Sequence, residues 1–185
     1  MFGGEKILSY NESVIIIPVF QEKFVLMYAD SFLDQLSQHT DKNNSTYPRT
    51  DILTNADKEI NRDWLNNSES NELIFPQLAI KPIKQISRFV DTIKSDSVMI
   101  VEDMFDVTKV NVSKTYYLTC LSNVNTNKTM HIVLCVLKDS TYLNRNSLEL
   151  LDYPEFQQAI DKNQIKDVNT IAAGTTINAI TKIKD

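Results

Sequence analysis

The chain has 185 residues, of which 42% are hydrophobic and 23% charged, and its formal net charge is −5. This length suits one domain with a core that needs neither a disulfide nor a structural metal, and the acidic balance disfavours non-specific nucleic-acid binding, which depends on clustered Lys and Arg. No apolar run reaches the roughly 18–20 residues of a membrane span and no signal-peptide pattern is present, so we expect a soluble, intracellular protein with no membrane attachment.

The first thirty residues are rich in β-branched and aromatic side chains. Two such runs, residues 14–17 and 23–28, flank Gln21-Glu22 and predict a β-hairpin. A short helix after residue 30 and a second helix over residues 54–66 are expected next. Polar, Asn- and Ser-rich connections surround the second helix, so we interpret residues 40–72 as a mobile insertion in a single domain that spans 1–185.

The middle of the chain predicts a helix followed by strands. Residues 73–80 are expected to be extended, and Pro82 suits the first turn of an amphipathic helix whose apolar residues recur every three to four positions. This helix is expected to end at residues 96–97. The predicted strands that follow are 98–101, 107–112, 115–121 and 130–137, and the last two flank a polar loop and form a second hairpin.

The C-terminal segment, residues 143–185, is expected to be helical and to dock on other structure. Asn146 and Glu149 have the spacing of a capping box, and Pro154 suits the start of a short helix. Residues 168–181 carry no charge, and their apolar spacing fits a helix and a strand about equally. Such a segment packs on the chain's own sheet or docks on another chain; the candidate contact residues are Val168, Ile171, Ile177, Ile180 and Ile183.

Together these elements predict an α+β fold in which an antiparallel sheet of about five to seven strands packs on amphipathic helices that cover one face. The two cysteines, Cys120 and Cys135, fall in the strands of the second hairpin. Cys120 is expected opposite about residue 131 and Cys135 opposite about residue 116, so the two sulfurs are out of register for a disulfide.

Glycine is nearly absent from this sequence. Gly3, Gly4 and Gly174 are the only three, whereas average usage is about 7%. Phosphate-cradling loops and the nucleophile elbow need glycine for close approach of the backbone and for strained φ angles. The sequence therefore excludes the P-loop, the dinucleotide-binding fingerprint and the elbow, and predicts no cofactor. The abundant Asn residues are expected to occupy left-handed turn positions instead.

The histidines are candidates for acid–base chemistry or zinc binding. His39 and His131 are the only two, and both are expected on the surface. His131 lies close enough to Cys120 across the second hairpin for a thiol–imidazole dyad.

Two groups of charged residues are further candidates. Glu102, Asp103 and Asp106 are expected together in a turn between two strands, and grouped carboxylates bind Mg²⁺ or Ca²⁺. Three basic residues at and after the start of the amphipathic helix predicted from Pro82 recur near helical spacing close to aromatic residues, as in proteins that bind single-stranded nucleic acid; they are Lys81, Lys84 and Arg88.

The absence of catalytic loops and the uncharged segment favour a non-catalytic subunit or adaptor of a larger intracellular or viral assembly, with other protein subunits as partners. One alternative is a small OB-like module that binds single-stranded nucleic acid through the three basic residues. Another is a carboxylate- or metal-dependent enzyme that uses the acidic group at 102–106.

Overall fold

The computed structural model describes residues 12–29, 72–80, 86–104, 111–143 and 148–184. In chain order the elements are β1 (Glu12–Phe20), β2 (Lys23–Tyr28), β3 (Leu73–Ile74), β4 (Gln77–Ile80), α4 (Ile86–Met104), β5 (Val112–Asn123), β6 (Lys128–Leu137), β7 (Leu148–Leu151), α5 (Tyr153–Asp161) and α6 (Val168–Lys184). Among these helices none is long and apolar enough to cross a membrane. The two helices predicted between β2 and β3, and all of the predicted insertion except Glu72, lie outside the described residues.

The strands form one seven-stranded sheet in the order β3-β2-β1-β6-β5, with β4 also paired to β1 and β7 to β2. The α+β class and the number of strands are confirmed, but the sheet is mixed, because β1 and β6 are parallel over eight residue pairs. The long connection that contains α4 allows this crossover. The burial of five consecutive residues of β1, from Val14 to Pro18, is what a central strand covered on both faces requires.

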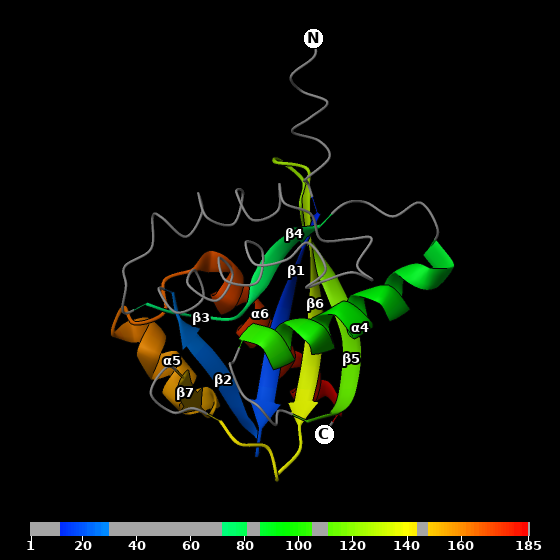
Figure 1. Ribbon diagram of the computed structural model, residues 1–185. Helices are drawn as coiled ribbons and strands as arrows, with labels where there is room; N and C mark the ends of the chain where they lie inside the picture. The colour runs from blue at the N-terminus through cyan, green and yellow to red at the C-terminus, as the bar shows by residue number, and fades with distance from the viewer. Residues whose placement is uncertain (1–11, 30–71, 81–85, 105–110, 144–147, 185) are drawn as a thin grey trace.

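Helices cover both faces of the sheet rather than one. Helix α4 crosses the face of β1, β5 and β6, and α6 lies behind the sheet (Figure 1). Side chains alternate along β1, so Ile16 packs in one core with Ile100 of α4, whereas Ile17 packs in the other with Phe156 of α5 and Ile177 of α6. The sheet is therefore the middle layer of three.

Helix α4 continues through residues 98–101, which the sequence predicted as a strand. Ile93, Ile100 and Val101 are buried and share one helical face at i, i+7 and i+8. The hydroxyl of Ser97 donates to the carbonyl of Ile93 at 2.7 Å, so this serine is accommodated inside the helix instead of ending it. Packing of the apolar stripe on the sheet outweighs the strand propensity of Val98–Val101.

The predicted capping box at Asn146 and Glu149 is wrong, because Leu148–Leu151 is strand β7 and pairs with β2. Glu149 instead accepts a hydrogen bond from the Tyr28 hydroxyl at 2.7 Å. A capping box does start the next helix: Asp152 and Glu155 each bind the other's backbone N–H at the start of α5. The helix predicted at Pro154 is thus confirmed.

The uncharged C-terminal segment is helix α6, and it packs on the chain's own sheet. Its start is held by the buried carboxylate of Asp167, which accepts from the backbone N–H of Thr170 at 2.9 Å, from its hydroxyl at 2.7 Å, and from the Gln77 side chain at 2.9 Å. Its middle contains the buried Gly174, where a Cβ would lie 2.4 Å from the ring of Phe156. A hydrogen-bonded start and a close helix contact therefore fix α6 in place.

Candidate functional site

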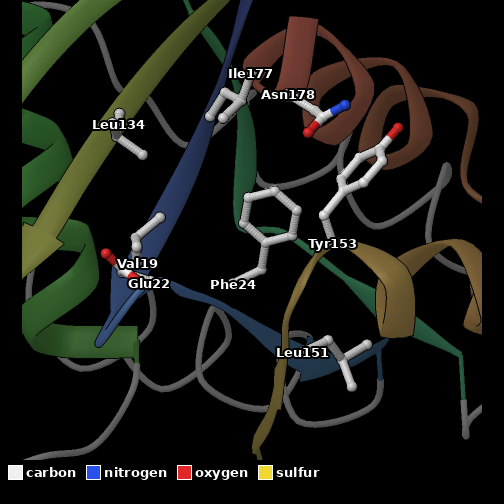
Figure 2. A pocket seen from close by; sticks show the side chains of 8 residues that line it. All are labelled: Val19, Glu22, Phe24, Leu134, Leu151, Tyr153, Ile177 and Asn178. Atoms are coloured by element: carbon white, nitrogen blue, oxygen red, sulfur yellow. The ribbon is translucent and has the colours of Figure 1, made fainter. Parts of the chain in front are cut away.

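A cavity of about 320 Å³ opens between the sheet and helices α5 and α6, at the end of the β1–β2 hairpin (Figure 2). It is lined by Val19, Glu22, Phe24, Leu134, Leu151, Tyr153, Ile177 and Asn178. Most of these side chains are apolar, and three carry polar groups. A concave, largely apolar site with few polar groups is typical of small-molecule binding, and this volume lies near the lower end of the roughly 300–1,000 Å³ range of such sites.

The apolar wall of the cavity is held by an aromatic cluster. The ring of Phe24 meets the rings of Phe75 and Phe156 edge to face, with centroids 5.6 and 5.1 Å apart. Tyr153 stacks on Phe156 at 6.2 Å. Because Phe75 and Phe156 are fully buried, the rings that line the cavity have little freedom to move, so the apolar wall is pre-formed.

The polar groups lie at two ends of the cavity. Figure 2 shows the Asn178 amide and the Tyr153 hydroxyl toward one end and Glu22 toward the other, beside Val19. Asn178 is four residues after Gly174, so the close contact of α6 with α5 also sets the position of its amide. This end offers a donor and an acceptor side by side, and the other end offers a carboxylate.

The backbone that carries Glu22 is strained. Gln21 and Glu22 form the two-residue turn of the predicted and confirmed β1–β2 hairpin, and both have positive φ, 52° and 66°. The turn geometry requires this, but residues other than Gly, Asn and Asp adopt it at a cost. The expectation that Asn fills such positions holds at Asn127 and Asn163 and fails at this turn. Strain of this kind is concentrated at functional sites.

The acidic group predicted at 102–106 does not lie in a turn between strands. Glu102 is exposed in the last turn of α4, and Asp103 follows it in the helix. Asp106 lies outside the described residues. Helix α4 packs on the face opposite the cavity, and in the parts of the chain that the structure describes no three His, Cys, Asp or Glu residues are grouped so that they could hold a metal ion.

The basic group is not brought together by the described structure. Lys81 and Lys84 lie outside the described residues, as does His39, and Arg88 is in the first turn of α4. Nucleic-acid contact through these residues stays a prediction.

The predicted partner-contact residues of the C-terminal segment do not share one exposed face. Val168 is 76% exposed, whereas Ile177 is buried in the core and lines the cavity. Ile171 and Ile180 are half-buried, and Ile183 is in the last turn of α6. Contact with a partner chain at these residues stays a prediction.

His131 was expected on the surface, and this prediction is wrong, because its side chain is buried under α4. Its Nδ1 atom lies 2.6 Å from the Tyr117 hydroxyl, and its Nε2 atom lies 3.5 Å from Oε1 of Glu12. Burial lowers the pKa of His131, and the charge of Glu12 only partly opposes this.

The predicted register of the β5–β6 hairpin is confirmed for Cys120, which lies opposite His131. It is one residue off for Cys135, which lies opposite Thr115.

No motif in the sequence marks the cavity residues as one site. Glu22 was recognised only as part of a turn, and Tyr153 and Asn178 belong to no motif. The only signal was indirect: a Gln-Glu pair at a hairpin turn that Asn or Gly would fill at lower cost. Ile177 was predicted as a partner-contact residue rather than as part of a cavity, and the other lining residues are ordinary core residues in sequence.

No known family model matches this sequence, and no curated protein matches it. Solved structures resemble it in fold. An ADP compounds hydrolase matches with a TM-score of 0.50 and 12% identity, over 94% of this chain and 74% of that one. A candidate NUDIX hydrolase from Listeria monocytogenes str. 4b F2365 matches with a TM-score of 0.43 and 14% identity, over 94% and 95% of the two chains. A NUDIX hydrolase from Nitrosomonas europaea matches with a TM-score of 0.41 and 8% identity, over 91% and 88%.

The first of these likenesses overturns the prediction of a non-catalytic adaptor or complex subunit, because this chain has the fold of a hydrolase. The physical reason for the error lies in the glycine argument. Scarcity of glycine excludes sites built from backbone loops, but it does not exclude a site built from side chains on strands and helices. The cavity beside α5 and α6 is lined in this way, by side chains of strands and helices together with Glu22 of the β1–β2 turn.

Proposed function

We propose that this chain is an enzyme that hydrolyses compounds containing ADP, and that the cavity holds the adenosine part of the substrate. The observation that carries the proposal is the fold likeness to an ADP compounds hydrolase, which spans 94% of this chain. The site supports it with chemistry of its own: a small apolar cavity with an amide at one end and a carboxylate at the other.

The adenine base fits the end of the cavity at Asn178. An Asn amide pairs with adenine through two hydrogen bonds, accepting from the exocyclic amine and donating to the adjacent ring nitrogen. Tyr153 and Phe24 supply aromatic surface, on which bases stack favourably. Guanine has acceptors at both of these positions, so the site favours adenine.

Glu22 is the group we assign to the chemical step. With the base at the Asn178 end, the sugar and phosphates lie toward the opposite end, where Glu22 is placed. Its carboxylate takes a proton from a water molecule, the water oxygen bonds to phosphorus, and the bond to the bridging oxygen breaks. Mg²⁺ is commonly held by one or two carboxylates together with substrate phosphates, so Glu22 would hold an ion that enters with the substrate and neutralises the phosphate charge.

The test is release of AMP from ADP-glucose in the presence of Mg²⁺, measured by chromatography, with GDP-glucose as the matched substrate. We expect Glu22→Gln to lower kcat by about 100-fold, the scale of general-base catalysis. Asn178→Leu is expected to remove about 10- to 100-fold of the adenine preference. Gln157→Ala, an exposed change on α5 outside the cavity, is the control and leaves both quantities unchanged.

Absence of nucleotide release from ADP-glucose, ADP-ribose and a diadenosine polyphosphate, with folded protein and Mg²⁺, would contradict the proposal. We also propose that the enzyme acts inside the cell, because both cysteines are free thiols and free thiols are usual in a reducing compartment.

A further inference from the structure

A second group of reactive side chains lies on the opposite face of the sheet, under α4. It consists of Glu12 on β1, Tyr117 and Cys120 on β5, and His131 on β6. Register places them together: Cys120 is directly opposite His131 on the antiparallel strand, and Val14 is opposite His131 on the parallel strand. Glu12, two residues from Val14, therefore has its side chain on the same face. We call these four residues the thiol cluster.

The centre of the thiol cluster is the buried imidazole of His131. The Tyr117 hydroxyl lies 2.6 Å from Nδ1, and the ring of Phe89 on α4 covers the imidazole at a centroid distance of 4.9 Å. Burial raises the pKa of Tyr117 to about 12, with further contributions from Cys120 and Glu12, so the phenol keeps its proton. One of the two tautomers of the neutral imidazole accepts this proton in a hydrogen bond at Nδ1. The neutral imidazole then carries its own proton on Nε2.

The Nε2 edge of His131 faces a carboxylate without a close hydrogen bond. Oε1 of Glu12 is 3.5 Å away, and among the described residues Nε2 has no hydrogen-bond partner. A neutral buried imidazole beside a carboxylate can accept a proton on its other nitrogen, because the positive charge that results faces the negative charge of Glu12. In its neutral form, the imidazole of His131 can therefore act as a base.

The thiol of Cys120 is the outer end of the cluster. Cys120 is exposed and lies directly opposite His131, close enough to Tyr117 to contribute to the raised pKa of Tyr117. Cys135, by contrast, is buried, and burial raises its pKa to about 12. The Cys120 thiol is therefore exposed to solvent and lies beside a histidine base, whereas the Cys135 thiol is buried.

We propose that Cys120 is a nucleophilic thiol that exchanges with small disulfides, and that Tyr117 and His131 relay its proton inward. The thiol proton moves to the Tyr117 oxygen while the Tyr117 proton moves to Nδ1 of His131, whose Nε2 proton faces Glu12. The thiolate attacks one sulfur of the disulfide, a new S–S bond forms and the old one breaks. The leaving thiolate takes up the proton as the relay runs backward. The products are a mixed disulfide at Cys120 and one free small thiol, so no further oxidant is needed.

The test uses the full chain and glutathione disulfide, with the adduct at each cysteine followed by intact-mass and peptide mass spectrometry. An ordinary thiol with a pKa near 8.5 is only about 3% ionised at pH 7, so a relay can raise the rate at most about 30-fold there. We expect an adduct at Cys120 alone, an unchanged rate in Cys135→Ser, and about a tenfold slower rate at pH 7 in Tyr117→Phe and His131→Gln.

The pH profile separates a relay from a structural role. The two relay variants are expected to approach the wild-type rate above pH 9, because thiols in general are mostly ionised there and need no base. Continued protection of Cys135 in each variant reports that the fold is intact, and Tyr117→Phe keeps the ring if His131→Gln does not fold. The proposal is overturned if Tyr117→Phe reacts at the wild-type rate with the same pH profile, which would make Cys120 an ordinary exposed thiol, or if Cys135 reacts as fast as Cys120.

Discussion

The substitution Gly174→Ala is the sharpest test of how α6 is positioned. A Cβ at residue 174 would lie 2.4 Å from Cζ, 2.7 Å from Cε2 and 3.1 Å from Cε1 of Phe156, whereas two carbon atoms prefer about 3.5–4.0 Å. The ring of Phe156 is fully buried and lies against the rings of Phe24, Phe75 and Tyr153. It cannot turn aside without moving the wall of the cavity.

The net effect is the difference between two opposed contributions. Replacing a helical glycine with alanine gains about 1 kcal/mol of helix propensity, and overpacking a closed core costs about 1–3 kcal/mol. Because the contact is short and the ring is enclosed, the overpacking cost should lie in the upper part of that range. After the gain in helix propensity is subtracted, we expect the free energy of unfolding to fall by about 1–2 kcal/mol. The assay is urea unfolding at 25 °C, with Thr175→Ala, an exposed change at the next residue of α6, as the matched control that is neutral or slightly stabilising.

A second variant identifies the cause of the loss. Phe156→Leu makes room for the added methyl, so Gly174→Ala should cost less in that background, with a coupling energy above about 0.5 kcal/mol. Strict additivity of the two changes, or a Gly174→Ala protein as stable as the Thr175→Ala control, would refute the close helix contact on which the position of Asn178 depends.

Three further predictions concern stability. Glu22→Gly relieves a positive-φ position and should raise the unfolding free energy by about 1 kcal/mol while lowering the proposed hydrolysis at least as much as Glu22→Gln does; an unchanged urea midpoint would contradict the strain. Asp167→Ala leaves the hydrogen-bond donors of Gln77 and Thr170 unpaired at the start of α6 and should cost about 2–4 kcal/mol in the same assay; a loss below 1 kcal/mol would contradict that role. The hydrogen bond to Glu149, together with burial, raises the pKa of Tyr28 to about 12. A raised pKa means that the folded state holds the proton more tightly, so its contribution is complete below pH 10 and is lost as the pH rises toward 12. Tyr28→Phe should weaken that dependence, and an identical dependence in both proteins would contradict it.

Local patterns in the sequence identified much of the sheet. The β1–β2 hairpin and the β5–β6 hairpin follow from apolar runs around short polar turns, and the register of Cys120 against residue 131 follows from the length of the second loop. The parallel pairing of β1 with β6 does not follow from any local pattern, because it depends on where the long connection through α4 returns the chain. The same limit explains the error at Val98–Val101, where a β-branched run forms helix because tertiary packing decides.

The candidate site was largely beyond reach of sequence reasoning. Glu22, Tyr153 and Asn178 come from three distant segments, and only the packing of α5 and α6 on the sheet brings them around one cavity. Gly174 was noted as one of three glycines, but the need for it is visible only in its contact with Phe156. The position of Cys120 opposite His131 was predictable, because neighbouring strands of a hairpin bring opposite residues together. The direct dyad was not, because the Tyr117 hydroxyl lies against Nδ1 of His131.

The most direct test of the central claim, that the cavity holds the adenosine part of the substrate, is a titration of methyl-labelled protein with AMP, followed by NMR. We predict shifts in the methyl signals of Val19, Leu134 and Ile177, which line the cavity, and none in those of Ile93 and Val133, which pack on the other face of the sheet. Shifts confined to that other face, or no shifts at millimolar AMP, would contradict the account.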